Sequence, residues 1–475
     1  MPMARRVTLL LLLSCLGISV WWGSSIARNV PGGPLDFQAV YYGARCLLQH
    51  HNPYRVAEVE ALYRSEGGEH QSDSIQRRQT VTLHVNLPAT FLFIAPFTML
   101  PLGAAQVLWS ILIAASLLLA AFLIWKVASE DAPILSACLI GLLLANSELV
   151  FLTGNTVGIV VSLCVVAVWC FIEDRLVPAG ILCMAVSLVI KPHDAGLVWL
   201  YFLLVGGVYR KRALQSLAVT AALALPAFLW VSLAVPHWIG DWRTNMAAIS
   251  APGGLNSPGP ASMTINILGS VVSLQTVFAA FRDDPRFYNP LTYLVCGALL
   301  AAWSVRTLRS GFSRAGAWLA LAAIAPITTI ITYHRSYDAK LLLLTVPACA
   351  LLWSRGGAIR WVALVINTAA FVLTADFPLT ILMIWARDLH VPAAGILAQI
   401  VTVVRMRPAP LILLVMGIFY LWVYIWRTDS DELKESKKAE GLVLPIGEAS
   451  GEPVPFHVAR ADVHHPAFSQ SIAQP

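Results

Sequence analysis

Charged residues are scarce in this chain. Only 12% of its 475 residues are Asp, Glu, Lys or Arg, whereas 58% are hydrophobic. Soluble globular proteins carry about 25% charged residues, which cover the surface that faces water. The composition therefore excludes an ordinary soluble domain. The apolar residues also fall in long runs, and a helix needs roughly 20 such residues to span a membrane.

Motifs for metal, redox and nucleotide chemistry are missing as well. The eight cysteines form no CxxC pair and seven of them lie in apolar runs, so neither a zinc site nor a disulfide framework is expected. The sequence has no Walker loop, no HExxH, no GxSxG and no GxGxxG in a strand–helix setting, which argues against ATP or nucleotide-sugar chemistry. No basic face interleaved with aromatic residues lies outside the apolar runs, so nucleic acid is not an expected partner.

Twelve apolar runs predict membrane-spanning helices. They cover residues 7–27, 103–126, 133–153, 156–172, 176–190, 193–209, 213–235, 290–306, 316–333, 339–353, 358–375 and 408–426. Most Lys and Arg residues of the short connections then fall on one side, which the positive-inside rule makes cytoplasmic. Arg5 and Arg6 before the first run would also suit a signal peptide, but the continuation through Trp21 and Trp22 favours an uncleaved helix.

Three further apolar stretches, 87–102, 262–281 and 377–404, are interrupted by proline, polar or charged residues. We expect them to be re-entrant or surface-lying segments on the outer face. The sequence thus predicts an all-α polytopic membrane module over residues 1–428, with a large outer-face loop at 28–86. The polar remainder, 429–475, is expected to be a disordered cytoplasmic tail.

The outer-face loop begins with a helical pattern. Apolar residues at positions 37, 40, 41, 44, 47 and 48 predict an amphipathic helix that lies in the interface between lipid and water. Asp36 stands at the start of this helix. It is either an N-cap or a carboxylate that points into a cavity as a general base.

Two connections on the same face are rich in ionisable residues. Residues 333–340 form either a solvated hairpin or an anion site in which His334, Arg335 and Lys340 hold a phosphate. Residues 191–194 lie between two apolar helices, where Lys191 either reaches the membrane surface or, together with His193, belongs to a functional site.

Several motifs, in order, resemble glycosyltransferase family 87, a group of polytopic enzymes with the C-type glycosyltransferase fold that use polyprenyl-phosphate sugars. The motifs span roughly residues 30 to 350 and comprise Asp36-Phe37, Tyr41-Tyr42, Leu47-Leu48, Pro53-Tyr54, Leu87-Pro88, Ala95-Pro96, Leu100-Pro101, Trp109, Gly154-Asn155 and Lys191-Pro192. The chain departs from the family pattern in its long charged segment Glu58–Thr80, and in the Asn-x-Ser stretch, which is matched only loosely by Ser262–Asn266.

The resemblance implies inverting transfer of a hexose, in particular mannose, from a polyprenyl phosphate to a lipid or glycan acceptor on the outer face of the cell membrane. Asp36 would be the general base. The donor phosphate would be held by His334, Arg335, Lys340, Lys191 and His193. Tyr41, Tyr42, Asn155 and Tyr333 would contact substrate. Because the sequence pairs no second carboxylate with Asp36, we expect the site to work without a metal or other cofactor.

Two other functions remain open. A secondary transporter or lipid flippase would place ionisable residues near the middle of the bilayer and often contains inverted repeats. Here the charges lie at the predicted helix ends and no repeat is visible. A membrane scaffold without chemistry would tolerate replacement of both Asp36 and Arg335.

Overall fold

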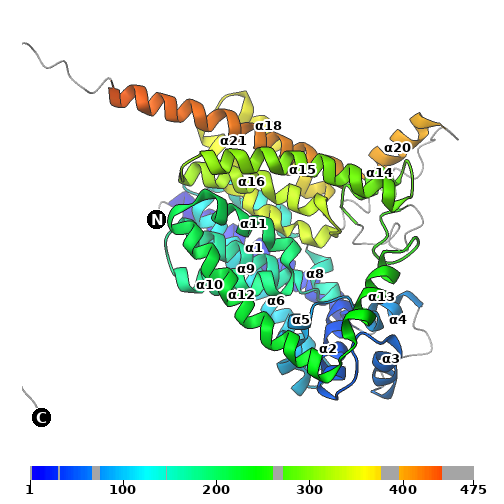
Figure 1. The fold of residues 1–475 in the computed structure, drawn as a ribbon. Coiled ribbons are helices and arrows are strands. Elements are labelled where there is room, and N and C mark those ends of the chain that lie inside the picture. Colours follow the sequence, from blue (N-terminus) through cyan, green and yellow to red (C-terminus); the bar gives the residue numbers. More distant parts are fainter. Residues whose placement is uncertain are drawn as a thin grey trace, which may run out of the picture. The chain divides into compact units, whose positions relative to one another are not determined.

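The computed structural model describes residues 3–29, 33–66, 75–145, 147–259, 271–375 and 395–440. It divides into a unit Met1–Thr428 and a unit Asp429–Pro475, at the position where the sequence predicts the tail to begin. The described part of the first unit consists of helices joined by turns and loops (Figure 1), with one isolated β-bridge between Val271 and Arg335. Residues 429–440 of the predicted disordered tail form the end of a helix that begins at Pro408, and residues 441–475 lie outside the described residues.

The helices of the first half of the chain run from α1 to α11. They are α1 (Met3–Asn29), α2 (Leu35–Leu48), α3 (Val56–Ser65), α4 (Ile75–Thr82), α5 (Pro88–Ile94), the 3₁₀ helix η1 (Ala95–Met99), α6 (Leu102–Ala128), α7 (Pro133–Ala145), α8 (Glu148–Thr153), α9 (Val157–Ile172), α10 (Val177–Ile190) and α11 (Pro192–Val205).

The second half supplies the remaining long helices. They are α12 (Gly207–Ala234), α13 (Trp238–Ser250), α14 (Gln275–Ala279), α15 (Pro285–Arg309), α16 (Arg314–Ile331), the 3₁₀ helix η2 (Ser336–Thr345), α17 (Val346–Arg355), α18 (Ala358–Leu373), α20 (Ile396–Met406) and α21 (Pro408–Glu440).

Each of the twelve apolar runs coincides with helix. Among the described residues, eight helical stretches are long and apolar enough to cross a membrane: α1, α6, α7 with α8, α12, α15, α16, η2 with α17, and α21. A helix satisfies its own backbone polar groups, which lipid cannot do, and this is why such runs become helical. The structure is that of a helical membrane protein. The runs at α9, α10, α11 and α18 form shorter apolar helices of 14 to 16 residues.

The three stretches not counted as crossings contain short helices where they are described. Residues 88–99 form α5 and η1, residues 275–279 form α14, and residues 396–406 form α20. Residues 262–270 and 377–394 of these stretches lie outside the described residues.

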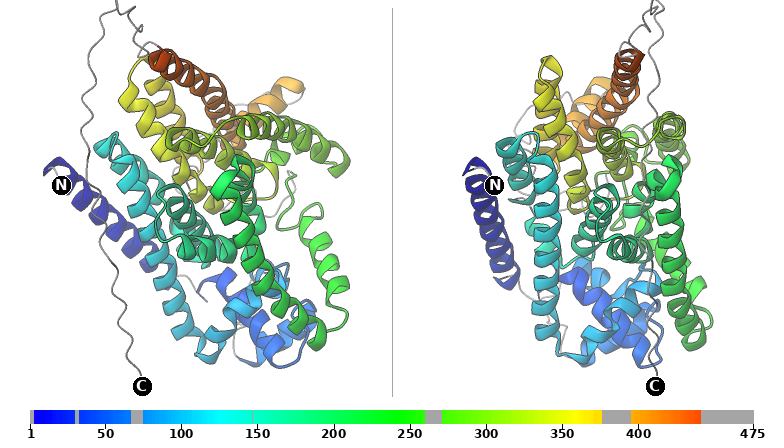
Figure 2. Two further views of the ribbon diagram at one scale, coloured as in Figure 1. Left: turned by 60° about the vertical axis from the view of Figure 1, so that its left-hand side comes forward. Right: turned by 90° about the vertical axis from the view of Figure 1, so that its left-hand side faces the viewer.

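Helix α2 forms where the spacing predicts it, but it does not lie on a surface. Ten of its fourteen residues are buried, because α3, α4, α5, η1, α6 and α8 pack around it. Figures 1 and 2 show α2 to α5, drawn in shades of blue, at one end of the long helices. The sequence pattern missed the enclosure because aromatic and small residues occupy the side that was expected to face solvent.

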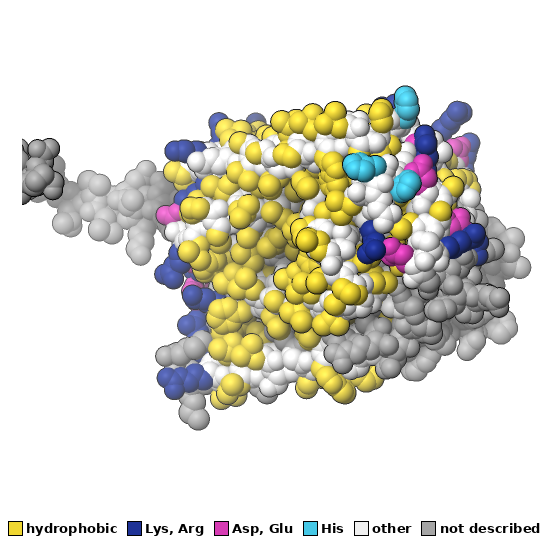
Figure 3. Space-filling view, turned by 90° about the horizontal axis from the view of Figure 1, so that it is seen from below, with side chains coloured by type: hydrophobic (Ala, Val, Ile, Leu, Met, Phe, Trp, Pro, Cys, Tyr) yellow, Lys and Arg dark blue, Asp and Glu magenta, His cyan; other side chains and the backbone are white. Residues whose placement is uncertain are grey.

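The outer surface carries an apolar band. Figure 3 shows hydrophobic side chains across the middle of one face, with Lys and Arg gathered at one end and a mixture of His, acidic and basic residues at the other. Exposed apolar residues also occur along α12, as Leu225, Leu229 and Leu233. Water would penalise an apolar surface of this extent, whereas a lipid environment accommodates it.

Candidate functional site

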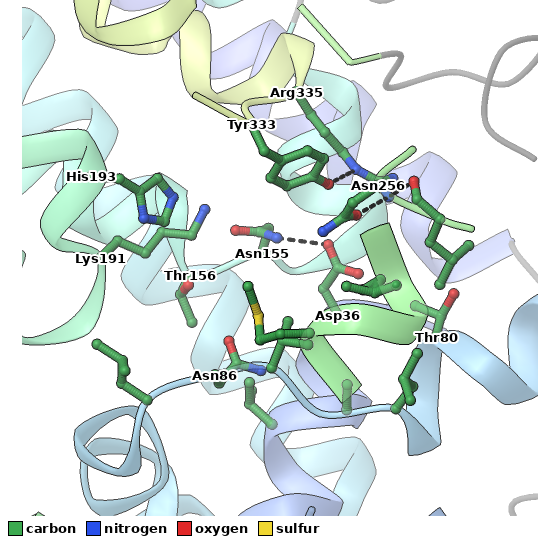
Figure 4. Close-up of a pocket in the computed structure, with 18 of the residues that line it drawn as sticks. Asp36, Thr80, Asn86, Asn155, Thr156, Lys191, His193, Asn256, Tyr333 and Arg335 are labelled. Carbon is green, nitrogen blue, oxygen red and sulfur yellow. Dashed lines mark hydrogen bonds between the residues drawn. The ribbon is translucent and has the colours of Figure 1, made fainter. Parts of the chain in front are cut away.

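A cavity of about 380 Å³ lies where seven parts of the chain meet: the start of α2, the 80–87 segment, the α8–α9 turn, the α10–α11 corner, α13, the loop at 255–256 and the α16–η2 corner. One part of its wall is polar and includes Asp36, Asn155, Lys191 and Arg335. The rest is largely apolar, with residues of the 80–87 segment and α13 (Figure 4).

Asp36 enters the cavity from the first turn of α2 and is half-buried. It is not the N-cap, because Pro34 occupies that position. The Nδ2 atom of Asn155 donates a hydrogen bond of 2.7 Å to Oδ2 of Asp36. The other end of the same amide, Oδ1, accepts from the backbone N–H of Val157 at 2.9 Å. Since the amide oxygen is thus occupied, its nitrogen is directed at the Asp36 carboxylate.

The α8–α9 turn is built to bring Asn155 to this place. Gly154 adopts a left-handed backbone conformation with φ of 63°, which glycine tolerates without strain. Its carbonyl accepts from the indole Nε1 of Trp109 at 2.7 Å. The Trp109 ring in turn stacks on Phe37, with ring centroids 5.3 Å apart. The turn and the start of α2 are therefore fixed to the same side chain of α6.

The α10–α11 and α16–η2 corners are joined by a buried ionic cluster. Nζ of Lys191 lies 3.1 Å from Oδ1 of Asp338 and 3.6 Å from Oδ2 of Asp194. Nε2 of His334 lies 3.0 Å from Oδ1 of Asp194. The second oxygen of Asp338, Oδ2, accepts from the backbone N–H of Arg335 at 2.6 Å. Two carboxylates therefore hold the two corners together.

Burial and ion pairing act in opposite directions in this cluster. Burial favours the neutral form of Lys191, but Asp338 and Asp194 outweigh it, so the pKa of Lys191 lies above its ordinary value. Burial likewise works to lower the pKa of His334, and the Asp194 carboxylate raises it overall. The carboxylates thus favour the charged forms of Lys191 and His334.

Arg335 reaches the cavity from the other side of its corner. Its Nη2 donates to the Leu255 carbonyl at 3.2 Å and to Oδ1 of Asn256 at 3.4 Å. Its Nε donates to the Tyr333 hydroxyl (Figure 4). All three partners are neutral oxygens, so the hydrogen bonds orient the guanidinium without cancelling its charge.

One group of side chains within the described ranges has the composition of a metal site. His193, Asp194 and His334 place potential ligand atoms within 4.8 Å of one another. However, the Asp194 carboxylate already faces His334 with one oxygen and the Lys191 ammonium with the other. A cation here would have to displace a lysine that is itself positively charged, which is an electrostatic obstacle.

Of the residues that the sequence predicts for the site, six line the cavity: Asp36, Asn155, Lys191, His193, Tyr333 and Arg335. His334 lies behind the wall and pairs with Asp194. Lys340 is buried away from the cavity, where its Nζ donates to the Leu143 carbonyl at 3.2 Å.

The two tyrosines expected to contact substrate lie elsewhere. Tyr41 and Tyr42 are almost fully buried inside the group of helices around α2 and are not part of the cavity wall. The Tyr41 hydroxyl donates to the Leu100 carbonyl at 2.9 Å. The Tyr42 ring packs edge-on against Tyr63, with centroids 5.1 Å apart. Both serve the packing of α2.

Several residues that the structure brings to the site are not among those predicted from the sequence. Tyr337 and Asn256 line the cavity, and the carboxylates of Asp194 and Asp338 support it from behind. A signal for the carboxylates exists: each lies three residues after a basic residue of its own corner, Lys191 or Arg335.

A scan of protein-family models, a search of curated proteins and a search of solved structures each find no match to this chain. The resemblance to glycosyltransferase family 87 therefore rests on the motifs alone and stays a prediction.

Proposed function

We propose that this protein is a membrane glycosyltransferase, similar to family 87 with its C-type fold, that transfers a hexose from a polyprenyl phosphate to a lipid or glycan acceptor. Mannose is the sugar that the resemblance favours. The observation that carries the proposal is the position of Asp36 in a cavity that also contains the Arg335 guanidinium. A carboxylate that accepts a proton and a cation that receives a phosphate are the two groups that this transfer requires.

The proposed step is an inverting displacement. The acceptor hydroxyl oxygen attacks the anomeric carbon, the bond from that carbon to the phosphate oxygen breaks, and the hydroxyl proton passes to Asp36. The polyprenyl phosphate leaves with the electron pair of the broken bond. Asn155 orients the Asp36 carboxylate through its 2.7 Å hydrogen bond, and Arg335 stabilises the charge that grows on the phosphate.

The apolar part of the cavity supports a lipid-linked donor. The wall of the same cavity includes the apolar side chains of Val85, Leu87, Trp242 and Ile249. One ligand with an apolar chain and a charged head would therefore contact both the apolar and the polar residues of the wall. We propose the extracytoplasmic side of the cell membrane for this cavity, because the positive-inside rule assigns the opposite loops to the cytoplasm.

The test is transfer of labelled mannose from polyprenyl-phosphate mannose into membrane lipids and glycans, with purified protein and isolated membranes as the acceptor source. Asp36→Asn should lower the rate by about 10²-fold or more, the range that general-base catalysis contributes. The matched control is Asp131→Asn, an exposed carboxylate that accepts from Ser354 outside the cavity. Near-normal transfer by Asp36→Asn would remove the proposed base.

Metal independence is part of the proposal. The attacking hydroxyl and the leaving phosphate are each assigned a protein group, Asp36 and Arg335. Transfer by protein treated with EDTA, with residual metal measured by mass spectrometry, should therefore stay within about twofold of the untreated rate, since no Lewis acid is part of the step. A loss restored by one added divalent cation would contradict it.

A further inference from the structure

The basic side chains that line the cavity are Lys191, His193 and Arg335. An imidazole is mostly neutral at pH 7, so Lys191 and Arg335 bring the positive charge, and these two differ in how far that charge is already balanced. This difference matters because an anionic group is attracted by the net charge of its surroundings and not by any one side chain.

Lys191 brings little net positive charge to the cavity. Its ammonium is shared by two carboxylates, Asp338 at 3.1 Å and Asp194 at 3.6 Å. Even a protonated His334, which pairs with Asp194, brings this group of four only to neutrality. An anion that approached Lys191 would also approach two buried carboxylates.

Arg335 differs from Lys191 in the charge of its hydrogen-bond partners. Its guanidinium donates to the Tyr333 hydroxyl, the Leu255 carbonyl and the Asn256 amide oxygen, none of which is charged. Among the described residues, no carboxylate forms an ion pair with it. Asp36 is the other charged group that acts on Arg335 from the same cavity, and it is not within ion-pair distance. The cation of the wall that no carboxylate pairs with among the described residues is therefore Arg335, whose planar fork also suits phosphate oxygens.

The same carboxylate that neutralises Lys191 holds Arg335 in place. Asp338 directs Oδ1 to the Lys191 ammonium and Oδ2 to the backbone N–H of Arg335. It is almost fully buried and does not line the cavity, so it acts from behind the wall. A carboxylate that caps the chain at Arg335 fixes the direction in which that side chain leaves the corner.

We propose that Arg335 alone binds the anionic head of the substrate. Lys191 instead joins the two corners through ion pairs that balance its charge. Asp338 is the positioning residue for Arg335. The inference rests on the proposed function only for the identity of the anion, a lipid phosphate. It reassigns Lys191, which the sequence predicts to bind the phosphate, to a structural role.

The experiment measures binding of decaprenyl phosphate to the purified full chain in detergent, together with the thermal unfolding midpoint of every variant. Arg335→Met should weaken binding by about 30-fold or more, as expected for loss of a charged hydrogen-bonding partner. Lys126→Met is the control, because Lys126 is exposed on α6 and contacts Trp169 outside the cavity.

Variants at Asp338 separate charge balance from direct binding. Asp338→Asn keeps an oxygen for the Arg335 N–H, so binding should stay within about threefold of the native value. Asp338→Ala loses that oxygen and should bind about tenfold more weakly. The double variant Lys191→Met/Asp338→Asn removes both charges together and should bind as Asp338→Asn does. Because it leaves no unpaired charge at this pair, it should also unfold at a higher temperature than Lys191→Met alone.

Two results would overturn the proposal. One is a loss of binding as large as in Arg335→Met. In the folded double variant such a loss would make Lys191 a direct ligand, and in Asp338→Asn it would show that the retained oxygen does not position Arg335. The other is native binding by Arg335→Met, or failure of the unmodified protein to bind either decaprenyl phosphate or pyrophosphate. Binding without any sugar transfer would refute the transferase and leave the anion site standing.

Discussion

The Asp36 carboxylate accepts its hydrogen bond from Asn155, a residue 119 positions further along the chain. The contact joins the first turn of α2 to the turn between α8 and α9. Asn155 also donates to the Tyr337 hydroxyl at 3.2 Å, so the same amide connects the candidate base to the α16–η2 corner. The geometry of the cavity therefore depends on one short polar side chain.

Replacement of Asn155 by alanine should slow sugar transfer without unfolding the protein. A hydrogen bond to a charged group contributes about 1.5–3 kcal/mol, which corresponds to a fall in kcat of about 10- to 100-fold. The control is Thr153→Ala in the same turn, because the Thr153 hydroxyl donates only to the Leu149 carbonyl of its own helix. Equal effects of the two substitutions on kcat would show that Asn155 does not orient the base.

Gly154→Ala should destabilise the fold. The added Cβ would lie 2.9 Å from Cβ of both Phe37 and Pro34, and φ of 63° is unfavourable for alanine. We expect a loss of about 1–3 kcal/mol in unfolding free energy, the cost of local backbone strain and overpacking. Unfolding in detergent by increasing denaturant measures it.

Gly141→Ala is the matched substitution for that measurement. Gly141 lies inside α7, and an added Cβ would meet no atom within 4 Å. Alanine is favoured over glycine in a helix by about 1 kcal/mol, so this variant should be as stable as the native protein or more stable. If Gly154→Ala were equally well tolerated, the strained turn would not be needed to place Asn155.

The positions of the helices could be predicted from the sequence, but the burial of individual helices by other helices could not. A long apolar run must become a helix in lipid, so the hydropathy of α6 or α12 is sufficient evidence. Helix α9 is buried almost throughout, and its 16 residues are held by protein on all sides. Hydropathy alone does not distinguish contact with lipid from contact with other helices.

The site was predictable where it depends on helix ends and unpredictable where it depends on the direction of side chains. Asp36, Asn155, Lys191 and Arg335 all lie at breaks between apolar runs, so their common location follows from counting crossings. Tyr41 and Tyr42 do not share the cavity with Asp36, because at 3.6 residues per turn they lie about 140° and 120° around α2 from it. Ala39 and Val40, which do line the cavity, are on its side of the helix.

Lys340 illustrates the same limit. It follows Arg335 by five residues, but η2 begins at Ser336 and carries it away from the cavity. The pairing of Lys191 with Asp338 joins residues 147 positions apart. Such a contact depends on the distance between two corners, which no local pattern in a single sequence encodes.

Single cysteines on opposite ends of the helices should label from opposite sides of the membrane. His51 and Lys211 are both exposed, the first beside α2 and the second near the start of α12. If the cavity faces outward, a membrane-impermeant maleimide should label His51→Cys in intact cells and Lys211→Cys only after permeabilisation. The unmodified protein measures background from the native cysteines, and the reverse pattern would place the cavity on the cytoplasmic side.

His84 should make the protein less stable in mild acid. Its imidazole is fully buried behind the cavity wall, next to Phe91, and within the described part of the chain neither ring nitrogen has a hydrogen-bond partner. Burial lowers the pKa of His84 to about 4, from 6.5 when exposed. Between these values the unfolded chain takes up a proton that the folded protein does not, so stability falls as pH drops from about 6.5 towards 4.

His84→Leu tests this assignment by thermal unfolding in detergent at several pH values. Removing an unsatisfied buried polar group should leave the protein as stable as the native form at pH 7, or more stable by about 1–3 kcal/mol. The advantage should grow towards pH 5, because leucine binds no proton. Any contribution of His334 is present in both proteins and cancels in the difference. His237→Gln, at an exposed histidine, should retain the native pH dependence. A constant difference between native and His84→Leu across this range would mean that His84 has a proton acceptor or donor in the folded protein.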